Sequence, residues 1–251
     1  MVKSVYKGKR WVLFFLLIQS LLKADAQSYP SEIYGDVTDK LGLKIATNGF
    51  GLHYRHTAPF RGPLTRVFDI DLTSLRHPRE KDIINNRLAN TRPYIYHKIN
   101  KVYSLRMLVG GQHILAGRNT KNSVGIAVFG GLGPSLNFIK PVYLDVQSAD
   151  PNNPTGYLIT SRRYQPEIIN PVYVIGYSSY FTGIGETKIH PGISFKTGAE
   201  FSWGSYGSDY KAIEVGVTVD YMPSKPVIIF KEKNKAFFSG FYISFAIGKN
   251  Q

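Results

Sequence analysis

The chain has 251 residues, no cysteine and a formal net charge of +14 at pH 7. The length allows one domain with a sizeable core, and the lack of cysteine excludes structural disulfides and a lipid-modified N-terminus. The positive excess indicates an anionic neighbour: nucleic acid, phosphate-bearing lipid or an acidic polymer.

The N-terminal segment has the pattern of an export signal. A basic stretch precedes a largely apolar run of twelve residues, 11–22, and the small residues that a signal peptidase needs end at Ala26. The run is too short for a membrane-spanning helix, which needs about 20 residues. We therefore predict a signal peptide at 1–26, cleaved before Gln27, and one mature domain at 27–251; an uncleaved anchor is the alternative. Export argues against nucleic acid as a partner.

Long segments of alternating polarity follow one another through the mature domain. One face of each is apolar and aromatic, and the other is small, polar or charged, which is the period of a β-strand. Six strands are predicted in this way, at about 64–75, 101–112, 123–138, 191–203, 211–221 and 237–248. They exceed the usual strand length in soluble sheets, about 5–6 residues, and match a tilted membrane strand of about 9–11 residues.

Two further features favour a barrel over a secreted β-sandwich, which would show the same alternation. The polar faces are rich in glycine and carry charges of both signs, as the interior of a membrane barrel does. Aromatic residues gather near the strand ends, where interfacial girdles lie, at Tyr103, Trp203, Tyr221, Phe237 and Phe238. We therefore predict a transmembrane β-barrel.

The stretch KIATNGFGLHY, 44–54, decides the number of strands. Its apolar side chains lie on odd positions up to Ile45 and on even positions from Phe50, so the chain bulges or turns back at Asn48-Gly49. Bacterial barrels have even strand numbers, and a hairpin here gives eight strands whereas a bulged strand gives seven. The predicted hairpin pairs Thr47 with Phe50, Ile45 with Leu52 and Leu43 with Tyr54. The expected fold is an all-β, up-and-down antiparallel barrel of eight strands, and the alternative has ten, with an extra pair inside 139–190.

The connections between these strands alternate in length. The longer ones are 76–100, 139–190 and 222–236, and the short ones are 113–122 and 204–210. In outer-membrane barrels the periplasmic turns are short and the outer loops are longer. Both termini are therefore expected on the periplasmic side, with the protein in the outer membrane of a Gram-negative bacterium.

The polar strand faces predict a charged interior. An eight-stranded barrel is nearly filled by its own side chains, and charges there must be paired. The predicted interior network comprises Lys44, Arg55, Asp69, Asp71, Arg106, Lys196, Glu200, Glu214 and Asp220. We interpret it as structural ion pairing; a catalytic or ion-conducting set of carboxylates is the alternative.

No motif marks a metal, cofactor or catalytic site. His53 and His56 are three residues apart, which places them on opposite faces of a strand, and the other histidines are scattered. No metal, cofactor or catalytic residue is therefore predicted. Ser178 or Ser179 with His190 is the pair that an outer-leaflet lipid-modifying enzyme would need.

A short helix is predicted in the longest outer loop. Asn170 has the residue type of an N-cap, Pro171 suits the first helical position and Gly183 suits the end. The spacing of the aromatic residues then makes one stripe, comprising Tyr173, Tyr177, Tyr180, Phe181 and Ile184. This stripe is expected to cover the barrel mouth or to form a docking face for a partner.

Basic residues are frequent in the other outer loops. The loop 76–92 carries Arg76, Arg79, Lys81, Arg87 and Arg92 with few acids. Arg and Lys at this level would meet the phosphates of lipopolysaccharide, which Arg can bind bidentately. Outer-membrane lipid, including lipopolysaccharide, is therefore an expected partner.

Four blocks of sequence carry a family resemblance: LTSLRHPRE (72–80), RPYIYHKIN (92–100), GPSLNFIKPVYLDV (133–146) and YFTGIGETKIHPGI (180–193). On these blocks the chain resembles small outer-membrane β-barrel proteins of Bacteroidota whose function is largely unassigned, and the family supplies no catalytic residues. GFYISFAIG (240–248) is similar to a terminal strand that the barrel-assembly machinery recognises, although the chain does not end on an aromatic residue.

The sequence thus predicts a non-enzymatic envelope protein that acts structurally or through its outer loops. One alternative is a component or partner of a secretion, gliding or transport machinery, with a protein bound at those loops. The other is an outer-leaflet lipid-modifying enzyme.

Overall fold

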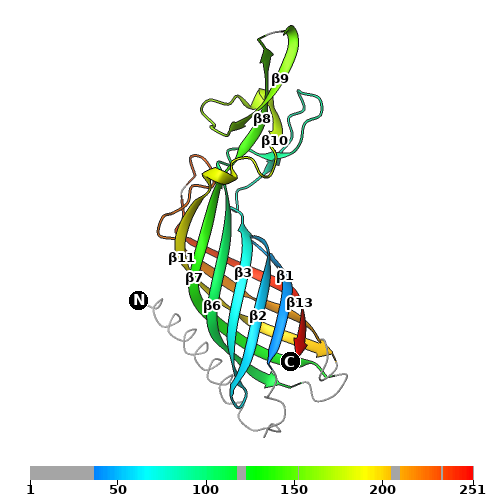
Figure 1. The fold of residues 1–251 in the computed structure, drawn as a ribbon, viewed down its shortest axis with the longest axis vertical. Coiled ribbons are helices and arrows are strands. Elements are labelled where there is room, and N and C mark those ends of the chain that lie inside the picture. The colour runs from blue at the N-terminus through cyan, green and yellow to red at the C-terminus, as the bar shows by residue number, and fades with distance from the viewer. Residues whose placement is uncertain (1–36, 118–122, 152, 205–209, 233, 251) are drawn as a thin grey trace, which may run out of the picture. The chain divides into compact units, whose positions relative to one another are not determined.

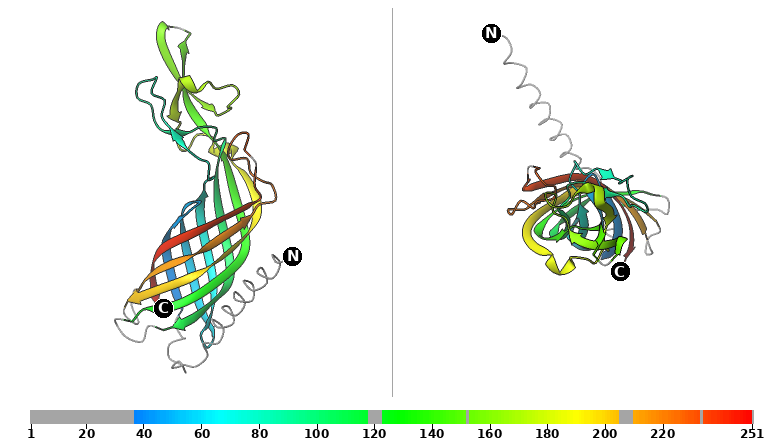
Figure 2. Two further views of the ribbon diagram at one scale, coloured as in Figure 1. Left: turned by 180° about the vertical axis from the view of Figure 1, so that it is seen from behind. Right: turned by 90° about the horizontal axis from the view of Figure 1, so that it is seen from above.

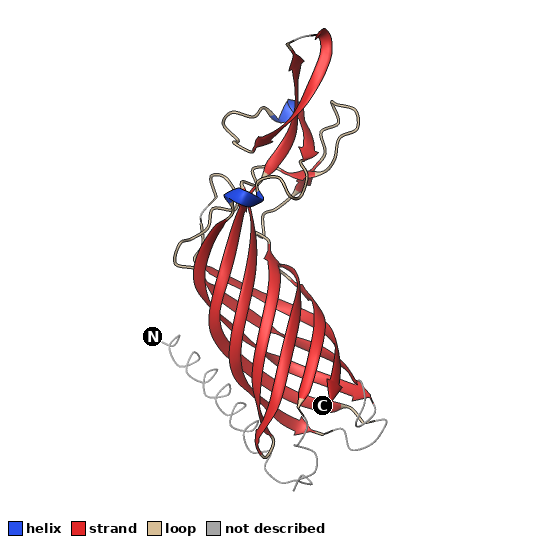
Figure 3. Ribbon diagram, in the orientation of Figure 1, coloured by secondary structure: helices blue, strands red, loops and turns tan. Residues whose placement is uncertain are grey.

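A computed structural model describes residues 37–117, 123–151, 153–204, 210–232 and 234–250. These residues belong to one compact unit, Tyr34–Gln251. The predicted signal peptide, 1–26, lies outside the described residues. Strands dominate the described chain (Figure 3).

Eight antiparallel strands close into a barrel (Figures 1 and 2). In chain order they are β1 (Thr38–Ala46), β2 (Gly49–Arg61), β3 (Leu64–Leu75), β6 (Asn100–Ala116), β7 (Gly125–Pro141), β11 (Lys188–Gly204), β12 (Tyr210–Tyr221) and β13 (Phe237–Asn250). Each strand pairs with its neighbours in the barrel, and β1 closes the ring against β13. The predicted eight-stranded, up-and-down barrel is confirmed, and the ten-stranded alternative is wrong.

The hairpin at the start of the barrel is present, but its register differs from the prediction. The turn is at Thr47-Asn48, so Ile45 pairs with Phe50 and Leu43 with Leu52. The shift amounts to two residues and therefore leaves every side chain on its predicted face. Gly49, which follows the turn, has a φ of +149° that side chains rarely adopt, and a Cβ built there would also lie 1.7 Å from the Ser74 carbonyl oxygen.

The barrel wall is apolar outside and polar inside. On β13, Phe241 is 70% exposed and Ile243 60%, whereas the intervening Tyr242 is 2% exposed and Ser244 1%. This pattern is the reverse of a soluble sandwich, whose strands bury their apolar face. An apolar wall that continues over eight strands needs lipid around it. The chain is therefore a transmembrane β-barrel.

Three strands in the longest connection form a separate sheet, which we call the cap sheet. They are β8 (Tyr143–Asp150), β9 (Asn153–Arg163) and β10 (Val174–Tyr177), in the order β10-β8-β9. The cap sheet has its own core, comprising Tyr94, Val142, Leu144, Val146, Tyr164, Ile169 and Val174. Tyr94 comes from the preceding loop, where β5 (Tyr94–Ile95) pairs with β4 (Asp82–Ile83). The extra strands inside 139–190 thus exist, but they lie outside the barrel.

The helix predicted between Pro171 and Gly183 is wrong in its extent. Asn170 does cap a helix, since its side chain accepts from the Val172 amide, but this 3-10 helix, η2, covers only Pro171–Tyr173. The next residues form β10, and a second 3-10 helix, η3, covers Ile184–Glu186. None of the helices in the described chain is long and apolar enough to cross a membrane.

The aromatic stripe expected on that helix is divided in the structure. Tyr177 packs against the core of the cap sheet, and its hydroxyl accepts from the Ile95 amide at 3.0 Å. Tyr173, Tyr180 and Phe181 remain exposed. Strand formation explains the difference, because the β-branched residues at 174 and 175 favour extended backbone.

Candidate functional site: the charged interior of the barrel

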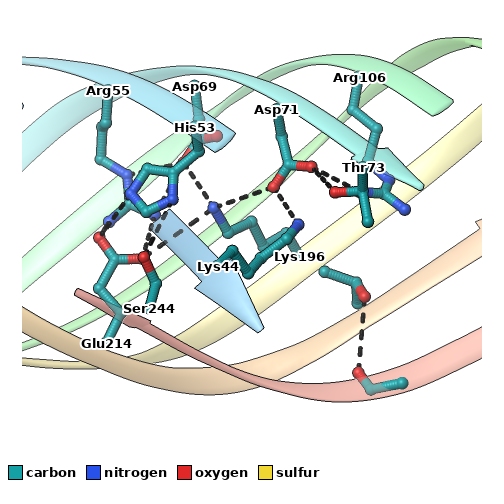
Figure 4. Close-up of polar contacts among 12 residues, drawn as sticks. Lys44, His53, Arg55, Asp69, Asp71, Thr73, Arg106, Lys196, Glu214 and Ser244 are labelled. Atoms are coloured by element: carbon teal, nitrogen blue, oxygen red, sulfur yellow. Dashed lines mark hydrogen bonds and ion pairs between the residues drawn. The ribbon is translucent and has the colours of Figure 1, made fainter. Parts of the chain in front are cut away.

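The structure places all nine residues of the predicted network inside the barrel, each at most 4% exposed. They come from β1, β2, β3, β6, β11 and β12. Strand alternation explains the placement: side chains two apart share a face, as Asp69 and Asp71 do on β3. Figure 4 shows seven of these side chains pointing toward one another: Lys44, Arg55, Asp69, Asp71, Arg106, Lys196 and Glu214.

One part of the network is centred on Arg106. Its guanidinium donates from Nε and Nη2 to the two carboxylate oxygens of Asp220, at 2.6 and 2.7 Å. Its Nη1 donates to Asp71 at 2.6 Å. Asp71 also accepts from Lys44 and Thr73, and Asp220 accepts from Ser194 at 2.5 Å. The fork of an arginine suits such two-sided pairing, for which a lysine has no equivalent geometry.

The other part is centred on Arg55. Its Nε donates to Asp69 at 2.8 Å, and its Nη1 lies 3.1 Å from Glu214. Lys40 pairs with Glu200 and lies 2.7 Å from Glu214. The Arg55 guanidinium carbon also lies 3.7 Å from the centroid of the Phe129 ring, a cation–π contact.

Lys196 joins the two parts. Its ammonium donates to Asp69 at 2.9 Å and lies 3.6 Å from Asp71. It also lies 5.3 Å from the centroid of the Tyr242 ring. The network therefore runs without interruption from Glu200 to Asp220.

Lys40 also belongs to the network and is absent from the predicted set, although it lies four residues before Lys44 and so has the same strand parity. The signal was present, but the beginning of β1 could not be placed without its partner β13. With Lys40 the network has five basic and five acidic side chains: Lys40, Lys44, Arg55, Arg106 and Lys196 against Asp69, Asp71, Glu200, Glu214 and Asp220. The formal charges of these ten side chains balance.

Each of the five carboxylates contacts a lysine or arginine within 3 Å. In this geometry each carboxylate already has a cationic partner. Buried charges that satisfy one another in this way lock the surrounding strands together. The arrangement supports bracing and sealing of the barrel.

Ser178 and His190, named above as a candidate pair for a lipid-modifying enzyme, have different partners in the structure. Ser178 donates to the Ser161 hydroxyl at 2.7 Å. His190 Nδ1 instead contacts the hydroxyl of Ser224, from the connection between β12 and β13. Among the described residues, no cluster of three His, Cys, Asp or Glu side chains could hold a metal ion.

Comparison with known proteins adds little. No protein-family model matches the chain, and no curated protein matches it. Among solved structures, the N-terminal β-barrel domain of Pseudomonas aeruginosa OprF matches with 6% sequence identity and a TM-score of 0.34. That match covers 86% of this chain and 98% of the OprF domain. A similarity this weak carries no argument about function.

Proposed function

We propose that the protein is a sealed anchor in the outer membrane of a Gram-negative bacterium, which holds the cap sheet at the cell surface. One observation carries the proposal: a charge-balanced side-chain network occupies the barrel interior. A lumen filled in this way leaves no path for ions or solutes. The cap sheet, with a core of its own, is then the part available to the surroundings.

In this proposal the protein acts through binding and not through catalysis. The chain is exported by its signal peptide, and the barrel-assembly machinery inserts it into the membrane. Basic side chains of the outer loops contact lipopolysaccharide phosphates. Exposed aromatic residues of the longest loop, Tyr180 and Phe181 among them, contact a protein of the envelope, such as a component of a secretion or gliding machinery.

Conductance across a planar lipid bilayer tests the anchor. The wild type should insert without conductance steps, and a variant carrying Arg55→Ser and Glu214→Ser, with smaller neutral side chains in the lumen, should conduct. A gel-mobility shift between unheated and boiled samples shows that each variant is folded. Steady conductance of the folded wild type would refute the sealed anchor.

One contact favours a second candidate function, an outer-leaflet lipid-modifying enzyme. The His190 ring nitrogen against the Ser224 hydroxyl is the beginning of a nucleophile–base pair. Purified barrel incubated with phospholipid and lipid A should then release or transfer an acyl chain, and Ser224→Ala should abolish this activity. Wild-type protein that leaves both lipids unchanged would eliminate this candidate.

A further inference from the structure

The cap sheet carries a groove that has no part in the proposed anchoring function. The groove has a volume of about 1000 Å³ and is lined by residues of β8, β9 and the segment 165–173, together with Leu88. Val146 and Ile169, which belong to the core of the cap sheet, also line it. The volume lies at the upper end of the range for small-molecule pockets, about 300–1,000 Å³.

Exposed apolar side chains form a large part of the groove walls, beside the polar residues Gln147, Ser148, Gln165 and Asn170. Tyr157 and Ile168 are each 73% exposed, and Tyr173 is 52% exposed, although all three line the groove. Scattered apolar side chains on a surface are ordinary, whereas a contiguous group around a concave surface marks a binding site. The groove therefore offers apolar contact area to a ligand.

The charged residues that line the groove are Arg162 and Arg163, and its described lining includes no Asp or Glu. Arg162 Nε donates to the Thr160 hydroxyl at 3.3 Å. Arg163 lies 3.2 Å from Glu186, and both of these side chains are about half exposed. Arg162 and Arg163 are consecutive residues of β9, so their side chains point to opposite faces of the strand. Arg163 pairs with Glu186 on one face, so Arg162 is the guanidinium available to an anionic ligand on the face of Val146.

We propose that this groove binds an amphiphile with a single acyl chain and an anionic head, which is either a carboxylate or a phosphate. The acyl chain lies against Val146, Tyr157 and Ile168, and the head is held by Arg162, since a guanidinium binds either group bidentately. Burial of each methylene strengthens binding by up to about fourfold.

Binding can be measured with a dansyl-labelled undecanoate, whose fluorescence rises in an apolar environment. The full-length mature protein is held in phosphatidylcholine discs, and empty discs provide the blank. Laurate, dodecyl phosphate and the cationic dodecyltrimethylammonium then compete with the probe. The two anionic competitors distinguish a carboxylate head from a phosphate head.

Two variants test the groove itself. Arg162→Gln should weaken probe binding about tenfold, which corresponds to about one charge-assisted hydrogen bond. The matched control, Lys81→Gln, removes the same charge from an exposed outer-loop position that does not line the groove, and it should bind as the wild type does. Ala149→Trp fills the groove from an exposed position and should abolish binding in protein that retains its gel-mobility shift.

The proposal expects saturable binding that at least one anionic competitor reverses and the cation does not. Decanoate should compete about tenfold more weakly than laurate, because it lacks two methylenes. Equal signals from loaded and empty discs, equal competition by the cation, or unchanged binding to Ala149→Trp would overturn the proposal. A conducting barrel would refute the sealed anchor without affecting this test.

Discussion

The interior network can be tested through Arg106, which is 1% exposed. Arg106→Met removes the guanidinium and keeps an apolar stem of similar length. Asp71 would retain Lys44 and Lys196, whereas Asp220 would retain, among its described contacts, only the Ser194 hydroxyl. Removing one member of a buried ion pair costs about 3–5 kcal/mol. We expect a loss of that size in the free energy of unfolding.

The double variant Arg106→Met with Asp220→Asn separates the ion pair from the packing. Asn has the size of Asp but no charge, so the double variant leaves no unpaired carboxylate at position 220. Replacing both members of a buried pair by neutral groups is often nearly neutral. We expect the double variant to lie within about 2 kcal/mol of the wild type and so to be more stable than Arg106→Met alone.

Equilibrium unfolding by urea in phospholipid vesicles measures these values. Trp203 is the single tryptophan of residues 27–251 and reports unfolding by its fluorescence. With a slope of about 1–3 kcal/mol per molar urea, Arg106→Met should lower the midpoint by about 2 M. The control Arg79→Met removes an exposed partner of Glu232 and should cost less than about 1 kcal/mol. If Arg106→Met costs no more than this control, the interior is hydrated and the reasoning fails.

Two further predictions concern packing and pH. Gly49→Ala should destabilise the barrel, because its Cβ would collide with the Ser74 carbonyl, whereas Gly185→Ala meets no atom within 4 Å and should leave the urea midpoint unchanged; equal midpoints for the two variants would contradict the close approach. Burial raises the pKa of Tyr164 in the cap sheet to about 12. A pKa raised above the unfolded value of about 10 stabilises the fold fully below pH 10, and this contribution is lost as the pH rises to about 12. Titration of tyrosinate absorbance should show a late-ionising group that Tyr164→Phe removes, and an unchanged titration curve would contradict the assignment.

The barrel could be predicted from the sequence because lipid outside and paired charges inside impose the same alternation on every strand. A local pattern of this kind needs no knowledge of strand partners, so the interior positions of residues such as Asp71 and Glu214 follow from parity alone. What parity does not determine is where a strand begins or how two strands align. For that reason Lys40 was missed and the first hairpin was placed two residues out of register.

The cap sheet could not be predicted from the sequence, for a different reason. Outside the membrane no lipid selects apolar side chains, so the periodicity weakens and helix and strand patterns overlap. The cap at Asn170 was identified correctly because it depends on one side chain and one amide. The end of this helix could not be predicted in the same way. It depends on the pairing of β10 with β8 and on Gly176, whose φ of +155° departs from helical geometry.

The central claim is that the apolar wall faces lipid while the charges face one another, and labelling along β13 tests it most directly. Because the chain contains no cysteine, single cysteines can be placed at each position from 241 to 247 and labelled with a fluorophore in vesicles. A lipid-dissolved quencher should act on labels at 241, 243, 245 and 247 and spare those at 242, 244 and 246. Equal quenching at all seven positions, or quenching of the odd-numbered set by a water-soluble reagent alone, would contradict the account.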